Sequence, residues 1–145
     1  MQNINTKISV LGSGAWGTAL AQLISKKSEV LMWVKEKKVK NEINQNHQNT
    51  KYLPGIKLSK NIVSTNNLED LEASDIIFLT VPVQYMSSIL RKIRKVIKGN
   101  VVFVCCSKGI EMNTLKLPSQ IVASYFPKHS IAVLSGPNFA EEVSR

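Results

Sequence analysis

The sequence is poor in cysteine and in long apolar runs, and each shortage excludes a class of protein. The two cysteines, Cys105 and Cys106, are neighbours inside an apolar run. Neighbouring thiols seldom bridge each other, so the sequence predicts no disulfide framework and indicates a reducing compartment. No apolar run approaches the roughly 20 residues that a membrane-spanning helix needs, and residues 1–7 are too polar for a signal peptide. We therefore expect a cytoplasmic protein without membrane insertion.

Acidic residues are also scarce, with 10 against 19 lysines and arginines, so the formal net charge is +9 over 145 residues. A basic balance is typical of proteins that bind nucleic acids, anionic membranes or phosphorylated small molecules. Aromatic side chains do not interleave with the lysines of residues 26–60, as a platform for single-stranded nucleic acid would require. We rank solvated surface first, a phosphate-bearing ligand second and nucleic acid a distant third, and we expect no nucleic-acid partner.

Groups that commonly hold metals or act as nucleophiles are equally sparse. His47 and His129 have no ligand partner at a usable spacing, so the sequence predicts no metal site. Cys105 and Cys106 are interpreted as core thiols, because a reactive cysteine needs an exposed, electropositive setting. The sequence shows neither a Ser-His-Asp arrangement nor paired carboxylates.

What the sequence does contain is an alternation of short apolar segments with segments of helical spacing. The predicted strands cover residues 7–11, 29–34, 62–64, 75–81, 101–106 and 131–134, and the predicted helices cover 15–26, 37–45, 83–97 and 117–125. A helical turn or two is expected at 67–72, a loop at 47–60 and a helix start after Pro137. Strands that are apolar throughout are typical of a parallel sheet covered on both faces.

The strongest motif is the run Gly12-Ser13-Gly14-Ala15-Trp16-Gly17, which matches G-x-G-x-x-G between the first strand and the first helix. In this pattern Gly12 lets the chain turn tightly, Gly14 lets the backbone approach a pyrophosphate, and Gly17 lets the helix pack against the strand. The strand–turn–helix context favours dinucleotide binding over an incidental turn. We predict a Rossmann-like, doubly wound α/β fold with a mainly parallel sheet and helices on both faces, forming one NAD(P)-binding domain over residues 1–145.

The residues after the second predicted strand are expected to contact the adenine ribose of the dinucleotide. An acid there bonds the 2′-hydroxyl of NAD, whereas a basic residue accommodates the 2′-phosphate of NADP. This chain has Lys35 followed by Glu36, and then Lys37 and Lys38. The mixture favours NADP without excluding NAD, and Lys37 and Lys38 are better interpreted as the start of a solvated helix.

Two further strand ends are candidate ligand sites, because ligands of open parallel sheets bind beyond the carboxyl ends of the strands. Lys108 follows strand 101–106 beside a glycine, where an ammonium could meet a phosphate or a carbonyl oxygen. The alternative, an ordinary surface lysine, stays open. The segment Ser135-Gly136-Pro137-Asn138 follows the last strand and opens a helix, so its free N–H groups would face the same crevice.

Six segments give the chain a family resemblance. They are GSGAWGTALA (12–21), EVLMW (29–33), NHQNTKYLPGIKL (46–58), LTVP (79–82), SKGIE (107–111) and AVLSGPNFAEEV (132–143). Together they resemble the bacterial-type NAD(P)-dependent glycerol-3-phosphate dehydrogenases over nearly the whole chain. The first segment is shared by many dehydrogenases, whereas the last two and the YLPG loop are specific to this family.

The resemblance implies an activity and a set of site residues. The family reduces dihydroxyacetone phosphate to sn-glycerol 3-phosphate with NADPH or NADH, at the head of phospholipid synthesis. Beside the glycines, the implied cofactor site holds Ala15, Trp16, Lys35, Lys108 and Ala140, and the implied substrate site holds Lys108, Gly136 and Asn138. Ala15 replaces a frequent serine, and Asn138 stands where serine or threonine is common. A homodimer is the implied assembly of the full-length protein.

Members of this family carry a second, helical domain that supplies the proton-transferring lysine, and the 145 residues contain no counterpart to it. Hydride transfer needs a cofactor, an oriented substrate and an acid. We therefore expect no catalytic residue in this chain, weak dinucleotide binding and negligible turnover by the chain alone. The alternatives are a stand-alone module that binds a dinucleotide or nucleic acid, and a fragment of another Rossmann dehydrogenase.

Overall fold

A parallel sheet forms the centre of the molecule. The computed structural model describes residues 6–136 and 139–145, and in them the sheet has six strands in the order β3-β2-β1-β4-β5-β6, each parallel to its neighbours. The strands are β1 (Ile8–Leu11), β2 (Val30–Trp33), β3 (Ile62–Thr65), β4 (Ile76–Leu79), β5 (Val102–Cys105) and β6 (Ser130–Val133). This order confirms the doubly wound α/β fold that the sequence predicts.

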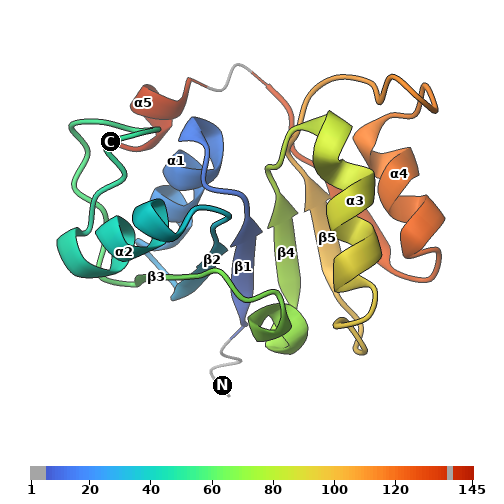
Figure 1. The fold of residues 1–145 in the computed structure, drawn as a ribbon, viewed down its shortest axis with the longest axis horizontal. Helices are drawn as coiled ribbons and strands as arrows, with labels where there is room; N and C mark the ends of the chain where they lie inside the picture. The colour runs from blue at the N-terminus through green and yellow to red at the C-terminus, as the bar shows by residue number, and fades with distance from the viewer. Residues whose placement is uncertain (1–5, 137–138) are drawn as a thin grey trace.

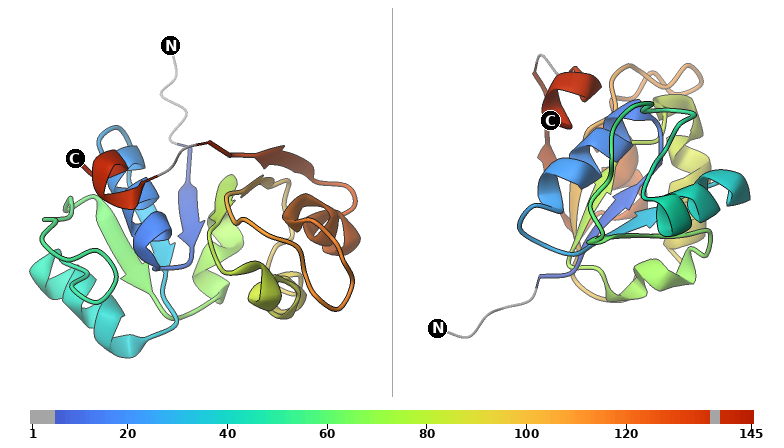
Figure 2. Two further views of the ribbon diagram at one scale, coloured as in Figure 1. Left: turned by 90° about the horizontal axis from the view of Figure 1, so that it is seen from above. Right: turned by 90° about the vertical axis from the view of Figure 1, so that its left-hand side faces the viewer.

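Helices connect the strands and cover both faces of the sheet. They are α1 (Ala15–Ile24), α2 (Lys37–Asn46), the 3₁₀ helix η1 (Glu69–Ala73), α3 (Val83–Ile93), α4 (Pro118–Tyr125) and α5 (Ala140–Val143). Figure 1 shows α1 and α2 beside the β1–β3 half of the sheet, and α3 and α4 beside the β4–β5 half. The short α5 packs against α1, although the two helices lie far apart in the sequence, as both views of Figure 2 show. In the described ranges, no helix combines the length and the apolar character needed to cross a membrane.

Two apolar cores lie on opposite faces of the sheet because successive strand residues point to opposite sides. Val10 of β1 packs with Ala21 of α1 and Ile43 of α2 in one core. Leu11, the next residue, packs in the other core with residues of α3 and α4, among them Met86. The chain therefore leaves β1 and β4, which are neighbours, toward opposite faces. The carboxyl ends of these two strands, at the top of Figure 1, form the switch point where such folds bind ligands.

The boundaries differ from the sequence prediction mainly at the end of α3. The apolar spacing predicts a helix over 83–97, and Ile97 is indeed buried, but the α-helix ends at Ile93. The N–H groups of Lys95 and Val96 bond to carbonyls three residues back, which tightens the chain into turns. Ile97 is therefore buried as the apolar pattern predicts, although Lys95 and Val96 no longer make α-helical hydrogen bonds.

Two glycines of the glycine-rich turn are required by the backbone itself. Gly12 has φ of +126°, in a region that favours glycine. Gly17 lies in α1, and a Cβ placed there would collide with the carbonyl oxygen of Gly12 and with Oγ1 of Thr80, which is 2.5 Å away. Thr80 is fixed in turn, because its Oγ1 donates to the carbonyl of Leu11 over 3.1 Å. The first helix can therefore approach the sheet this closely only with glycine at position 17.

Replacing Gly17 by alanine is expected to destabilise the fold by about 2 kcal/mol, since overpacking against immobile backbone costs roughly 1–3 kcal/mol. Urea denaturation followed by circular dichroism measures this change. Gly99→Ala is the matched control, because a Cβ at Gly99 would have no heavy atom within 4 Å. Equal stability of the Gly17 and Gly99 variants would contradict the close approach described here.

Candidate functional site

Two adjoining cavities form a cleft along the carboxyl ends of the central strands. The larger cavity has a volume of about 480 Å³ and the smaller about 300 Å³, and Thr80, Val81 and Pro82 line both. The other residues of the larger cavity come from the glycine-rich turn, the end of β2, the loop before β3 and α3: Gly12, Ser13, Gly14, Trp33, Lys35, Glu36, Tyr52, Tyr85, Ser88, Ile89 and Lys92. Those of the smaller cavity are Trp16, Cys106, Ser107 and Lys108.

Gly14 gives this cleft an open backbone surface at the N-terminus of α1. It precedes the helix in extended conformation, with φ of −64° and ψ of 177°, which any residue could adopt. A Cβ at this position would meet no heavy atom within 4 Å. Gly14 is therefore not needed for packing, and its bare backbone leaves room beside the free N–H groups of the first helical turn. Those N–H groups favour a bound anion such as a pyrophosphate.

Charged side chains stand at both ends of the cleft. Lys35 and Lys92 line the larger cavity, and Lys108 lines the smaller. Lys35 is exposed and its Nζ lies 5.9 Å from the centre of the Tyr85 ring, a distance at which cation and aromatic face attract. The cleft therefore combines a positive potential with aromatic surface, as a ligand that carries phosphates and a base requires.

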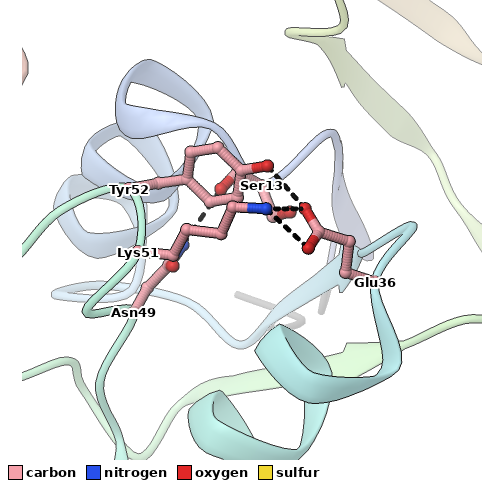
Figure 3. A network of polar contacts seen from close by, with 5 residues as sticks. All are labelled: Ser13, Glu36, Asn49, Lys51 and Tyr52. Atoms are coloured by element: carbon pink, nitrogen blue, oxygen red, sulfur yellow. Dashed lines mark hydrogen bonds and ion pairs between the residues drawn. The ribbon is translucent and has the colours of Figure 1, made fainter.

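Glu36 contributes a carboxylate to the larger cavity, but its oxygens are already engaged (Figure 3). Lys51 Nζ donates to both oxygens, at 2.7 and 2.9 Å, and the Tyr52 hydroxyl donates to Oε1 at 2.5 Å. These bonds, that of Lys51 first, hold the pKa of Glu36 below its ordinary value. The carboxylate thus stays ionised, with its charge directed toward the loop that carries Lys51 and Tyr52.

That loop, residues 47–58, is here named the strap because it crosses from α2 to the glycine-rich turn. Its fixed point is Asn49, whose side chain is fully buried. Asn49 Nδ2 donates to the Ser13 carbonyl at 2.9 Å and to Thr18 Oγ1 at 2.8 Å, and Figure 3 shows the first of these bonds. The strap is therefore fastened to the turn that would hold the pyrophosphate.

Lys108 lies on a second ordered loop, residues 107–117, at the other end of the cleft. Its Nζ is exposed and lies 3.4 Å from the Gly136 carbonyl oxygen. The buried Glu111 holds the loop on α3, accepting hydrogen bonds of 2.5 Å from the hydroxyls of Ser87 and Thr114. These two bonds, that of Ser87 first, keep the pKa of Glu111 below its ordinary value.

The structure brings most of the predicted site residues together. Gly12, Gly14 and Lys35 line the larger cavity, and Trp16 and Lys108 line the smaller. Gly17 is a buried residue of α1, and Gly136 lies beside Lys108.

Ala15 and Ala140 are not among the residues that line either cavity, and Ala140 begins α5, which packs on α1. Their contacts with a cofactor stay predictions. Asn138 lies outside the described residues.

The sequence motifs assign no role to Tyr52 or Tyr85. They mark Glu36 only as the acidic member of a mostly basic segment after the second strand. Tyr52 lies in a loop without periodic pattern, and only the family resemblance of its YLPG segment marked it. Cys105 and Cys106 are free and buried, as expected of core thiols. Burial raises the pKa of Cys105 to about 11 and that of Cys106 to about 12, so neither thiol is poised to react.

Comparison with known proteins agrees with this geometry. The family model described as the N-terminus of NAD-dependent glycerol-3-phosphate dehydrogenase matches residues 7–145. A glycerol-3-phosphate dehydrogenase [NAD(P)+] from Neorickettsia sennetsu is 44% identical over 92% of this chain and 40% of its own length. One from Zymomonas mobilis is 43% identical over 95% of this chain and again 40% of its own length. The chain thus spans about two fifths of the length of these two curated relatives.

Solved structures give the same result. A glycerol-3-phosphate dehydrogenase from Coxiella burnetii superposes with a TM-score of 0.90 at 27% identity, over 97% of this chain and 43% of that one. The yeast Saccharomyces cerevisiae enzyme superposes with a TM-score of 0.87 at 32% identity, over 96% and 44%. An arogenate dehydrogenase from Synechocystis reaches a TM-score of 0.64 at 15% identity, over 86% and 39%, which shows a shared fold alone.

The anchoring of the 107–117 loop by Glu111 predicts a pH-dependent contribution to stability. A carboxylate with a lowered pKa in the folded state stabilises the fold above its unfolded pKa of about 4.5, and the contribution is lost as the pH falls through the folded value. Urea unfolding should therefore show wild type more stable than Glu111→Gln at neutral pH, with the difference shrinking below about pH 4.5. Glu29→Gln, at an exposed carboxylate before β2, is the control. A difference that stays constant down to about pH 3 would contradict this account.

Proposed function

The chain belongs to the family of NAD-dependent glycerol-3-phosphate dehydrogenase N-terminal domains, and from that premise we propose that its cleft binds NAD(P)H. The observation that carries the proposal is the bare backbone of Gly14 beside the uncapped N-terminus of α1, open to a cavity of about 480 Å³. A pyrophosphate needs such a combination of free N–H groups and an approach without side chains.

The residues present fit a dinucleotide along the whole cleft. The free N–H groups at the start of α1 would hold the pyrophosphate, and Lys35 would lie near the adenosine end. Trp16 and Lys108 would lie near the nicotinamide end, in the smaller cavity. When bound, the reduced cofactor supplies a hydride. The chain's part is to bind and orient the cofactor at the switch point between β1 and β4.

For the whole protein we propose reduction of dihydroxyacetone phosphate to sn-glycerol 3-phosphate, a step toward phospholipids. The names of the relatives support this substrate, and so does Lys108, an exposed cation at the smaller cavity. Lys108, Gly136 and Asn138 would bind the substrate. The acid that protonates the product oxygen would come from a helical domain beyond this NAD(P)-binding domain, so the chain alone would not turn over substrate.

We favour NADP over NAD as the cofactor because Lys35 lies at the end of β2, where a cation meets the 2′-phosphate. A cytoplasmic location is supported by the free thiols of Cys105 and Cys106. The homodimer and the absence of a nucleic-acid partner stay predictions.

Gly14→Ala tests the binding site without disturbing the fold. The added methyl group has free space in the structure, and a Gly-to-Ala change before a helix costs only about 1 kcal/mol. It would fill the approach of the pyrophosphate, so we expect the Kd of NADPH to rise at least about tenfold. The fluorescence of Trp16 and Trp33, which line the two cavities, reports binding. Unchanged affinity would place the dinucleotide elsewhere.

Lys35→Ala tests the cofactor preference. Loss of a cation beside the 2′-phosphate should weaken NADPH by about tenfold and leave NADH within about twofold. Lys38→Ala is the matched control, because Lys38 is an exposed lysine of α2 that is not among the cavity-lining residues. Equal losses for NADPH and NADH would argue against a role of Lys35 at the 2′-phosphate.

A further inference from the structure

We propose that Lys51 is a specificity-determining residue, which favours NADPH over NADH by holding the Glu36 carboxylate away from the adenine ribose. This inference rests on the proposed binding of NAD(P)H in the cleft. It assigns a role to the strap, a segment that the G-x-G-x-x-G motif does not include.

Glu36 occupies the place where an acid would select NAD. It lies three residues after β2 and lines the larger cavity together with Lys35. In dinucleotide-binding folds, an acid in this region accepts a hydrogen bond from the ribose 2′-hydroxyl. Glu36 is also the residue before α2, but its side chain makes no capping bond to that helix. Its carboxylate is therefore directed by other partners.

Those partners are Lys51 and Tyr52, and the position of Lys51 indicates how it acts. Glu36 and Tyr52 line the larger cavity, whereas Lys51 is not among the residues that line it. Lys51 nevertheless donates to both oxygens of Glu36, at 2.7 and 2.9 Å. Lys51 thus contacts the carboxylate without lining the cavity, and we assign it the role of a group that restrains the carboxylate rather than that of a direct ligand.

The electrostatic consequence differs between the two dinucleotides. A phosphate monoester carries a charge of about −1.5 to −2 near neutral pH, so a free carboxylate at the end of β2 would repel NADPH. The same free carboxylate would bind the 2′-hydroxyl of NADH. The carboxylate does not escape this repulsion by taking up a proton near neutral pH, because its ordinary pKa is 4.5 and its bonds to Lys51 and Tyr52 lower the pKa further. Its restraint by Lys51 leaves Lys35 as the charge that the ribose end meets.

The strap presents Lys51 from a fixed segment. Asn49, two residues before it, is buried and bonded to Ser13 and Thr18, and Leu53, two residues after it, is 2% exposed. The Lys51–Glu36 pair itself is open to solvent, with exposed side-chain fractions of 53% and 41%. Exposed ion pairs add little to folding stability, so changes at either residue should alter binding rather than folding.

The test is a cycle of four chains: wild type, Lys51→Ala, Glu36→Gln and the double variant. NADPH and NADH are titrated into each, and tryptophan fluorescence gives both Kd values. We expect Lys51→Ala to lower the preference for NADPH by about tenfold, through weaker NADPH binding and unchanged or tighter NADH binding. Glu36→Gln should keep or raise the preference. With glutamine at position 36, Lys51→Ala should change the preference by less than about threefold.

Lys57→Ala is the matched control, since Lys57 is an exposed lysine of the strap whose Nζ bonds to the Asn46 carbonyl. It should leave the preference unchanged. Equal loss of NADPH affinity on removing Lys51 in both backgrounds would make Lys51 a direct phosphate ligand and overturn the inference. An equal loss of affinity for NADPH and NADH in Lys51→Ala would show that the strap has only a structural role, and it would also overturn the inference. If the wild type binds neither dinucleotide, the proposed function fails and the inference fails with it.

Discussion

The contact between α1 and the backbone of the glycine-rich turn is the constraint on which the rest of this structure depends. Gly17 lies against the carbonyl of Gly12 and the hydroxyl of Thr80, with no room for a methyl group. This contact brings the first turn of α1 to the carboxyl ends of β1 and β4. The free N–H groups of that turn then open into the cleft, where Gly14 leaves them uncovered. One helix–sheet distance thus sets both the packing and the anion site.

Two anchored loops extend this site in opposite directions. The strap is fastened by Asn49 to the glycine-rich turn and carries Lys51 and Tyr52 to Glu36. The loop at 107–117 is fastened by Glu111 to α3 and carries Lys108. In both loops a buried polar side chain anchors the segment, and an exposed lysine extends from it. Anchoring a loop on a rigid element is a general way to position charge for ligand recognition.

The sequence predicted the sheet and its helices because those elements depend on local periodicity. The apolar runs gave the strands, and the spacing from Gly12 to Gly17 gave the turn, since each follows from residues close together in the chain. The pairing of Glu36 with Lys51 could not be predicted in this way. It joins residues 15 apart, through a loop without pattern, and depends on where the buried Asn49 fastens that loop. The end of α3 at Ile93 was missed because burial continues to Ile97 while the hydrogen bonds change.

The central claim is that a dinucleotide lies across the glycine-rich turn. An NMR titration of the isotopically labelled chain with NADPH tests it most directly, because every backbone amide reports its own surroundings. The account predicts that the largest shifts fall on Gly14, Ala15 and Trp16, with further shifts at Lys35 and at Lys108. Shifts confined to exposed basic residues of α3 and of the turns that follow it, at Arg91 and Lys95, with the glycine-rich turn unchanged, would contradict it.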